Sequence, residues 1–83
     1  MTTTIPVIYS VNNCPQCENT KNFFAAHGVD YKEINITTDE QKRTEFREKG
    51  VRAAPVVEFG SDWWTGFNLS KIQSAIASFK AAV

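Results

Sequence analysis

The sequence predicts an α/β fold in which a four-stranded mixed sheet carries three helices, in the order βαβαββα. Short runs rich in β-branched and aromatic residues alternate with longer segments of helical character, and glycine, proline or asparagine separates most of them. A helical segment separates the first two apolar runs, so these strands are expected to be parallel. Only a short turn separates the last two runs, which predicts a hairpin. The 83 residues, 42% apolar and 22% charged, are expected to form a single domain over residues 1–83.

The chain is expected to begin with a buried strand and an amphipathic helix. Residues 5–11 form the apolar run, with Pro6 at its start because proline donates no hydrogen bond to a sheet. Pro15 suits the first position of the helix, which is expected to run to about Ala26 and to stop at Gly28. The inner side of this helix is expected to carry Cys17, Thr20, Phe23 and Phe24.

A second strand and a second helix follow. The strand is predicted over residues 31–36, and a side chain among residues 37–39 is expected to cap a helix that ends at about Lys49, before Gly50.

This second helix is mostly charged. Asp39 and Arg43, and likewise Glu45 and Lys49, stand at the i,i+4 spacing that favours ion pairs, and Phe46 is the one large apolar anchor. We therefore expect a solvated surface helix rather than a binding stripe.

The second half of the chain predicts a hairpin and a last helix. A strand over residues 56–59 follows Pro55, and residues 60–62 turn the chain into a partner strand over residues 63–65. Asn68 is a suitable cap for the last helix. The core stripe of that helix is expected to consist of Leu69, Ile72, Ile76 and Phe79. Helices are expected on both faces of the sheet.

Composition argues against several classes of function. Nine basic residues balance nine acidic ones, so no electrostatic grip on nucleic acid or on an anionic membrane is expected. No apolar run approaches the roughly 18–20 residues that span a bilayer, and the first residues lack the pattern of a secretory signal. We expect a soluble cytoplasmic protein.

The two cysteines, Cys14 and Cys17, are the most informative residues. A secreted domain stabilised by disulfides usually has four or more cysteines, and a bridge between these two would close almost no loop. The same spacing forms half of many zinc sites, but the chain has no second pair. Its only histidine, His27, lies about 15 Å from Cys17 at the helical rise of about 1.5 Å per residue. We therefore expect a redox-active disulfide and no bound metal or other cofactor.

The position of the pair assigns a different task to each sulfur. Cys14 precedes the helix, whose N-terminus favours a thiolate through its free N–H groups and its dipole; the N–H of Gln16 or of Cys17 can reach the sulfur. Cys17 lies one turn further in and is expected to be more buried. Cys14 is therefore expected to attack a target disulfide, and Cys17 to resolve the mixed disulfide that results. Gln16 either contacts a docked partner or faces solvent.

Three blocks of sequence, taken in order, resemble the glutaredoxin family and, within it, the NrdH-redoxins most closely. The resemblance covers nearly all of the chain. The blocks are Cys14-Pro15-Gln16-Cys17 with Thr20-Lys21, then Ala54-Pro55-Val56-Val57, and finally Trp64-Thr65-Gly66-Phe67.

The resemblance implies a thioredoxin-like fold with a cis peptide bond before Pro55, where the backbone of Ala54 pairs with a bound substrate segment. Gly66 and Phe67 should lie near the disulfide, with Trp64 beneath it. The expected partner-binding residues are Pro15, Gln16, Ala54, Pro55, Gly66 and Phe67. Trp63 is then either an exposed aromatic or partly covered by the last helix.

The family's function follows as an expectation. NrdH-redoxins receive electrons from NADPH through thioredoxin reductase and donate them to class Ib ribonucleotide reductase. Glutaredoxins use glutathione, held by a T-V-P segment and a G-G-x-D turn, which here read Ala53-Ala54-Pro55 and Thr65-Gly66-Phe67-Asn68. We expect a monomeric thiol–disulfide oxidoreductase that couples to thioredoxin reductase and acts on ribonucleotide reductase or other disulfide substrates.

Two alternatives stay open. Pro15 and Arg52 resemble features of glutathione-dependent glutaredoxins, so glutathione remains a candidate reductant. Some relatives of glutaredoxins bind an iron–sulfur cluster between two subunits, so a metal-binding module is the alternative from another class.

Overall fold

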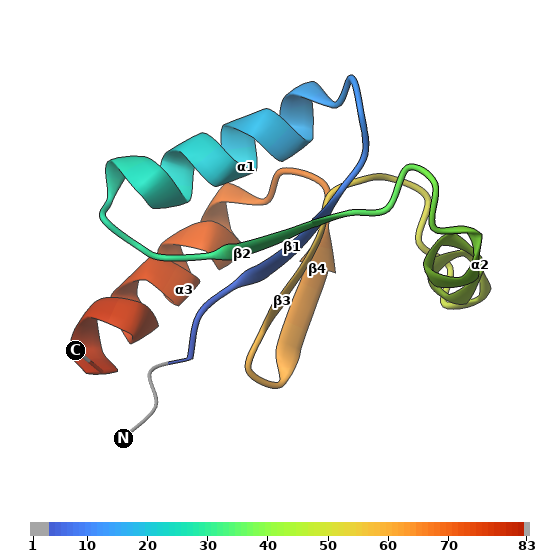
Figure 1. Ribbon diagram of the computed structural model, residues 1–83. Helices are drawn as coiled ribbons and strands as arrows, with labels where there is room; N and C mark the ends of the chain where they lie inside the picture. Colours follow the sequence, from blue (N-terminus) through green and yellow to red (C-terminus); the bar gives the residue numbers. More distant parts are fainter. Residues whose placement is uncertain (1–3, 83) are drawn as a thin grey trace.

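The computed structural model describes residues 4–82. Its elements follow the predicted order: β1 (Val7–Ser10), α1 (Pro15–Ala26), β2 (Lys32–Asn35), α2 (Glu40–Glu48), β3 (Val56–Phe59), β4 (Asp62–Thr65) and α3 (Leu69–Ala82). The sheet has the strand order β2-β1-β3-β4, with β1 and β2 parallel and the other two pairs antiparallel (Figure 1). The predicted thioredoxin-like architecture is confirmed.

The sheet separates two apolar clusters because successive side chains of a strand point to opposite faces. Ile8 and Val57 belong to the larger cluster, which α1 and α3 cover with Phe24 and Ile72. Tyr9, next to Ile8 in β1, packs instead against the smaller cluster. The buried members of that cluster are Ile36, Phe46 and Val56. Helices α1 and α3 therefore cover one face of the sheet, whereas α2 contributes Phe46 to the other face at the ends of the strands, so the prediction of helices on both faces holds only in part.

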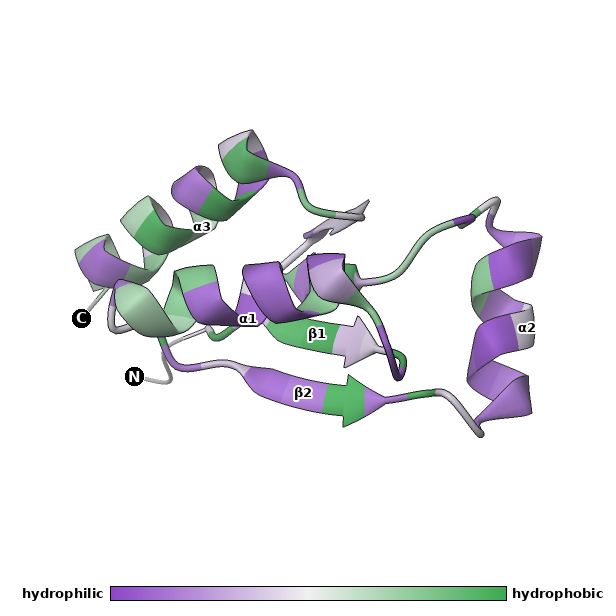
Figure 2. Ribbon diagram, turned by 90° about the horizontal axis from the view of Figure 1, so that it is seen from above, coloured by the Kyte–Doolittle hydropathy of each residue, from purple (hydrophilic) through white to green (hydrophobic). Residues whose placement is uncertain are grey.

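Helix α2 stands apart from the other two helices. Figures 1 and 2 show it beyond the carboxyl ends of β1 and β2, which is also the end of the sheet where α1 begins. Phe46, 6% exposed, is its buried apolar residue, as expected. The end of the sheet that carries the cysteines thus lies near a helix whose remaining residues are mostly charged.

The cap and the ion pairs of α2 differ in how well the sequence predicts them. Of the three candidate caps, Asp39 caps the helix: its Oδ1 accepts a hydrogen bond of 3.0 Å from the backbone N–H of Lys42. The expected pairs of Asp39 with Arg43 and of Glu45 with Lys49 are not among the ion pairs of residues 4–82. Glu45 instead pairs with Lys42 at 3.2 Å. The two ion pairs predicted from the i,i+4 spacing are therefore wrong. Asp39 binds the backbone N–H of Lys42 instead, and the Lys42 side chain pairs with Glu45.

The core stripe of α3 is shorter than the sequence predicts. Asn68 caps this helix as expected, accepting the N–H of Lys71 at 3.1 Å, and Ile72, Ala75 and Ile76 are buried. Leu69, however, is 42% exposed, so its assignment to the core was wrong. Leu69 is the first residue of the helix, and a helical side chain leans toward the N-terminus, which here carries it past the end of the core.

Candidate active site at the Cys14–Cys17 disulfide

The site begins with a disulfide between Cys14 and Cys17, whose Cα atoms are 5.2 Å apart, within the usual range for such bonds. Cys14 is the N-cap of α1: its backbone is extended and its Sγ accepts the N–H of Cys17 at 3.1 Å. Of the two donors expected from the sequence, Cys17 is the one in contact. A helix N-terminus therefore points a backbone donor at this sulfur, which stabilises negative charge there.

The two sulfurs differ in accessibility. Cys17 is 1% exposed and packs on the inner side of α1, whereas Cys14 is half-buried and borders an open hollow with Asn13, Pro15 and Glu18. Only Cys14 is thus open to another molecule, which is the arrangement that an attacking and a resolving cysteine require.

The segment before β3 reaches the site through the β4–α3 loop. The Ala54–Pro55 peptide bond is cis, as the family resemblance implies, and Pro55 is fully buried. The carbonyl of Pro55 accepts the N–H of Gly66 at 2.8 Å. This bond places the expected partner-binding residues of two separate loops side by side.

Gln16, between the cysteines, joins the disulfide to the same loop. Its Oε1 accepts the backbone N–H of Phe67 at 2.9 Å. Gly66 has a φ of +72°, and a Cβ added there would lie 3.0 Å from the same oxygen. Gln16 is exposed to solvent, yet its side-chain amide oxygen makes this contact within the protein, which the sequence does not reveal. Three segments, around Gln16, Pro55 and Phe67, are therefore joined to one another beside the disulfide.

Aromatic residues continue from Phe67 along α1. Phe67, 38% exposed, meets Phe23 edge-on with ring centroids 6.2 Å apart, and Phe23 stacks on His27 at 4.8 Å. His27 Nδ1 is 2.9 Å from the Phe23 carbonyl, near the end of α1. Trp64 is buried in the core, whereas Trp63 is 46% exposed, so the exposed alternative holds for Trp63.

A charged network that sequence reasoning missed stands beside Cys14. Lys21 Nζ lies 2.8 Å from Glu18 and 2.9 Å from Glu33, and the buried Ser10 hydroxyl donates to Glu33 at 2.8 Å. The hydrogen bonds from Lys21 and then Ser10 lower the pKa of Glu33, and those to Glu18 and then Glu33 raise the pKa of Lys21.

These contacts hold the Lys21 side chain against the surface, and only 15% of it is accessible. The three-residue spacing of Glu18 and Lys21 could have signalled one of these contacts. The contact with Glu33 joins a helix to a strand and has no local signal.

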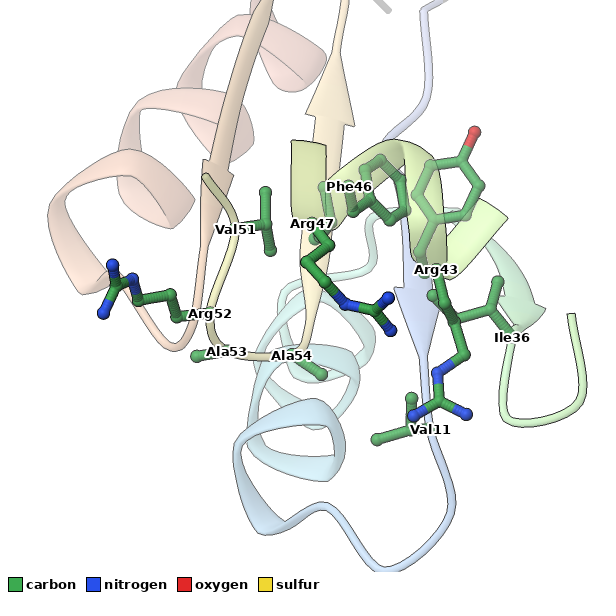
Figure 3. Close-up of a pocket in the computed structure, with 11 residues that line it drawn as sticks. Val11, Ile36, Arg43, Phe46, Arg47, Val51, Arg52, Ala53 and Ala54 are labelled. Atoms are coloured by element: carbon green, nitrogen blue, oxygen red, sulfur yellow. The ribbon is translucent and has the colours of Figure 1, made fainter. Parts of the chain in front are cut away.

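Arg52 lies at the rim of a second hollow, between α2 and the end of the sheet, which Ala53 and Ala54 also line. Figure 3 shows its side chain extending away from the other two arginines of that hollow. Arg52 thus shares this hollow with Ala54, one of the expected partner-binding residues.

Neither a metal cluster nor a membrane span is found over the described range. No group of three or more His, Cys, Asp and Glu side chains within residues 4–82 is arranged to hold a metal ion. Across the same residues, no helix is both long enough and apolar enough to cross a bilayer.

Comparison with known proteins gives consistent matches. The family model described as Glutaredoxin matches residues 7–64. The chain is 35% identical over 65 residues to the glutaredoxin-like protein NrdH of Lactococcus lactis subsp. cremoris, a match that covers 78% of this chain and 90% of that protein. It is 37% identical over 60 residues to NrdH of Escherichia coli K12, covering 72% of this chain and 74% of that one.

Among solved structures, the chain is similar to the glutaredoxin-like protein NrdH-redoxin from Escherichia coli, which is described as having a thioredoxin-like activity profile. The TM-score is 0.78 at 33% identity, over 83% of this chain and 91% of the other. The similarity thus extends over most of both chains.

Proposed function

Because this chain belongs to the glutaredoxin family and resembles its NrdH members, we propose that it is a dithiol–disulfide oxidoreductase that carries electrons from thioredoxin reductase to protein disulfides. The observation that carries the proposal is the half-buried Cys14 sulfur at the N-terminus of α1, in contact with the N–H of Cys17. A cytoplasmic location accompanies the proposal, because thioredoxin systems keep thiols reduced in the cytosol.

The reaction is proposed to start from the reduced protein. The thiolate of Cys14 attacks one sulfur of the target disulfide, the target S–S bond breaks, and the released target sulfur takes up a proton. Cys17 then loses its proton and attacks Cys14 Sγ, the mixed disulfide breaks, and the second target sulfur leaves as a thiolate that is protonated. Two electrons and two protons have passed to the target, and the Cys14–Cys17 disulfide remains. Thioredoxin reductase returns two electrons from NADPH.

Helix α1 stabilises the thiolate from which this reaction starts. The N–H of Cys17, 3.1 Å from the Cys14 Sγ, favours Cys14 as the attacking thiolate. Cys17, 1% exposed, is shielded from outside disulfides and reacts with the sulfur next to it. Gln16, Ala54, Pro55, Gly66 and Phe67 form the proposed docking surface around Cys14, and Pro15 borders it.

Thioredoxin reductase is proposed as the reductant on two grounds. The similar Escherichia coli protein has a thioredoxin-like activity profile. In addition, the turn that helps to hold glutathione in glutaredoxins reads Thr65-Gly66-Phe67-Asn68 here and lacks both the acidic residue and the first glycine of the G-G-x-D pattern. Class Ib ribonucleotide reductase is the proposed physiological target, with other protein disulfides as further substrates.

Glutathione is the second candidate reductant. Pro15 follows the first cysteine as it does in glutathione-dependent glutaredoxins, and Arg52 stands beside Ala53 and Ala54 at the second hollow. The iron–sulfur alternative predicts coloured protein with bound iron, which metal analysis of freshly purified protein measures.

Two coupled assays of NADPH oxidation, with the same disulfide substrate, test the proposal. One contains thioredoxin reductase, and the other contains glutathione and glutathione reductase. We expect turnover in the first and little in the second. Turnover only in the second would make the protein a glutathione-dependent glutaredoxin.

Cysteine variants test the order of attack. We expect Cys14→Ser to abolish turnover and to form no adduct with the substrate. Cys17→Ser, a matched change one turn away, is expected to accumulate the mixed disulfide at Cys14, which intact-protein mass spectrometry detects. An adduct on Cys17 in the Cys14→Ser protein would reverse the assigned roles.

A further inference from the structure

Besides the hollow that Cys14 borders, the protein has a second hollow between α2 and the end of the sheet. Its volume is about 260 Å³, and its apolar floor includes the buried side chains of Ile36, Phe46 and Val56. Figure 3 shows Ile36 and Phe46 among the residues that line it. Sites for small molecules usually measure about 300–1,000 Å³, so this hollow has the size for one side chain and its neighbouring group.

Two arginines close the hollow on the side of α2. In Figure 3 the side chains of Arg43 and Arg47 reach toward Val11 and Ala54 from the same helix. Like charges at this i,i+4 spacing repel each other and destabilise a helix.

Neither arginine forms an ion pair over residues 4–82, since the ion pairs found there involve lysines only. Arg43 Nη1 donates to the Thr37 carbonyl at 3.0 Å, and Asp39 is engaged as the cap of the helix. Glu40 shares a separate shallow hollow with both arginines and does not pair with either. An anion bound by both guanidinium groups would remove their repulsion.

The hollow adjoins the candidate active site. Ala54 lines it, and the next residue, Pro55, accepts the N–H of Gly66 beside the loop that Gln16 holds. Val11 lines it as well and lies three residues before Cys14 in the sequence. A segment whose cysteine reacts with Cys14 can therefore extend from Ala54 into the hollow.

We propose that this hollow binds the part of a protein substrate that flanks its reacting disulfide, with an apolar side chain on the floor and the carboxylate of an adjacent Asp or Glu between Arg43 and Arg47. The inference rests on the proposed function and names the class of substrate: disulfides flanked by an apolar and an acidic residue. Guanidinium groups bind carboxylates through paired N–H donors, which suits a carboxylate held between two of them.

The floor favours a peptide over other anions. A free phosphate would leave the apolar floor empty. Glutathione offers carboxylates but no apolar side chain to cover Ile36, Phe46 and Val56, whereas a protein segment supplies both groups at neighbouring positions. Helix α2, which the sequence predicts to be a solvated surface helix, would thus bind the substrate carboxylate through Arg43 and Arg47.

Synthetic peptides test this specificity. Each peptide carries one internal disulfide, and they differ only in the two residues beside it: Leu-Glu, Leu-Gln, Ser-Glu or Leu-Lys. The chemically reduced protein is mixed with each peptide, and acid-quenched samples give the rate constant of reduction. We expect the Leu-Glu peptide to react about fivefold faster than Leu-Gln or Ser-Glu, as suits an exposed ion pair with one apolar anchor.

Variants of the two arginines complete the test. Arg43→Gln with Arg47→Gln is expected to remove the fivefold preference for the Leu-Glu peptide over the Leu-Gln peptide. Arg43→Glu with Arg47→Glu is expected to make Leu-Lys the preferred peptide. A misfolded protein would not gain this preference. Lys32→Gln with Lys80→Gln removes the same charge at exposed positions outside the hollow and should keep the preference.

Other results would overturn the inference. These are equal rates for all peptides, a preference that survives Arg43→Gln with Arg47→Gln, or equal rates for Ser-Glu and Leu-Glu. Glutathione disulfide reduced faster than the Leu-Glu peptide, with that advantage lost in the same variant, would assign the hollow to glutathione instead. Failure to reduce even the Leu-Gln peptide would contradict the proposed function itself, which distinguishes the two failures.

Discussion

At the scale of single residues, Gly66 is subject to two constraints at once. Its φ of +72° disfavours any side chain, and the side-chain oxygen of Gln16 occupies the space that a Cβ would need. The same oxygen accepts the N–H of Phe67, so the loop cannot move away without losing a hydrogen bond. The approach of this loop to the disulfide therefore depends on one glycine and one amide.

Gly66→Ala is expected to lower the free energy of unfolding by about 2 kcal/mol, of which the left-handed backbone accounts for about 1–2. In a Gln16→Ala background the obstructing oxygen is gone, so Gly66→Ala should cost less there. Urea unfolding of the oxidised single and double variants measures the difference. Strictly additive costs would show that Gln16 does not obstruct the Cβ.

Glu33 links stability to pH. Its pKa lies below the ordinary carboxyl value of about 4.5 because Lys21 and Ser10 donate hydrogen bonds to it. A depressed pKa contributes stability that is complete above the unfolded value and is lost as the pH falls from about 4.5 through the folded pKa.

We therefore expect Glu33→Gln to be less stable than the parent at neutral pH and to lose less stability on acidification below about pH 4.5. Chemical unfolding at a series of pH values measures both effects. Glu48→Gln, a matched change at an exposed carboxylate outside the ion pairs of residues 4–82, should leave the acid limb unchanged. Parallel curves for Glu33→Gln and the parent would contradict the argument.

At the scale of elements, α3 shows how position along a helix decides burial. Leu69 and Ile72 fall on one stripe of the sequence, yet Leu69 is 42% exposed and Ile72 is 0% exposed. The stripe continues toward the N-terminus beyond the last strand that could cover it.

Alanine at these two positions should give very different results. Ile72→Ala is expected to cost about 2–5 kcal/mol of unfolding free energy because it leaves a cavity in the larger cluster. Leu69→Ala is expected to cost less than about 1 kcal/mol. Thermal or urea unfolding of the pair measures this, and similar costs would mean that Leu69 is covered in solution.

The same distinction explains what the sequence could predict. The beginnings and ends of helices depend on residues a few positions apart, so Pro15, Asn68 and the place of Cys14 before α1 were predicted from local chemistry. The contact of Gln16 with Phe67 joins residues 51 positions apart, and that of Lys21 with Glu33 joins residues 12 apart. Such contacts depend on how elements pack, and no local pattern encodes them.

The site shows this division in detail. The cysteine pair and its order of burial follow from their place on a helix, and the family resemblance indicated Pro55, Gly66 and Phe67. For the arginines of α2, the charge pattern predicts only a solvated face. Their orientation toward Ala54 depends on where α2 stands relative to the sheet, which charge pattern alone does not determine.

At the scale of the whole molecule, the chain is small, with a Cα radius of gyration of 12.5 Å. The proposed docking surface is built from loops that meet at one end, where a partner would have to reach Cys14. A second copy on that surface would cover the disulfide.

We therefore expect solution scattering of the oxidised protein to give the mass of one chain, 9.3 kDa, at all concentrations that are practical. The radius of gyration should stay close to the value of about 12 Å that scaling gives for a monomer of this length. Reduction with dithiothreitol should leave the mass unchanged. A mass twice as large would instead favour a shared site between two copies.

The two ends of the sheet carry different parts of the molecule, with the disulfide at one end and the start of β1 at the other. Figures 1 and 2 show that β1 begins and α3 ends on the side away from the loop that leads into α1. A tether attached at either end of the chain would thus leave the disulfide facing outward. The protein could be anchored to an electrode or fused to a reporter through either end, and electron exchange at Cys14 would then be read out from a fixed, oriented layer.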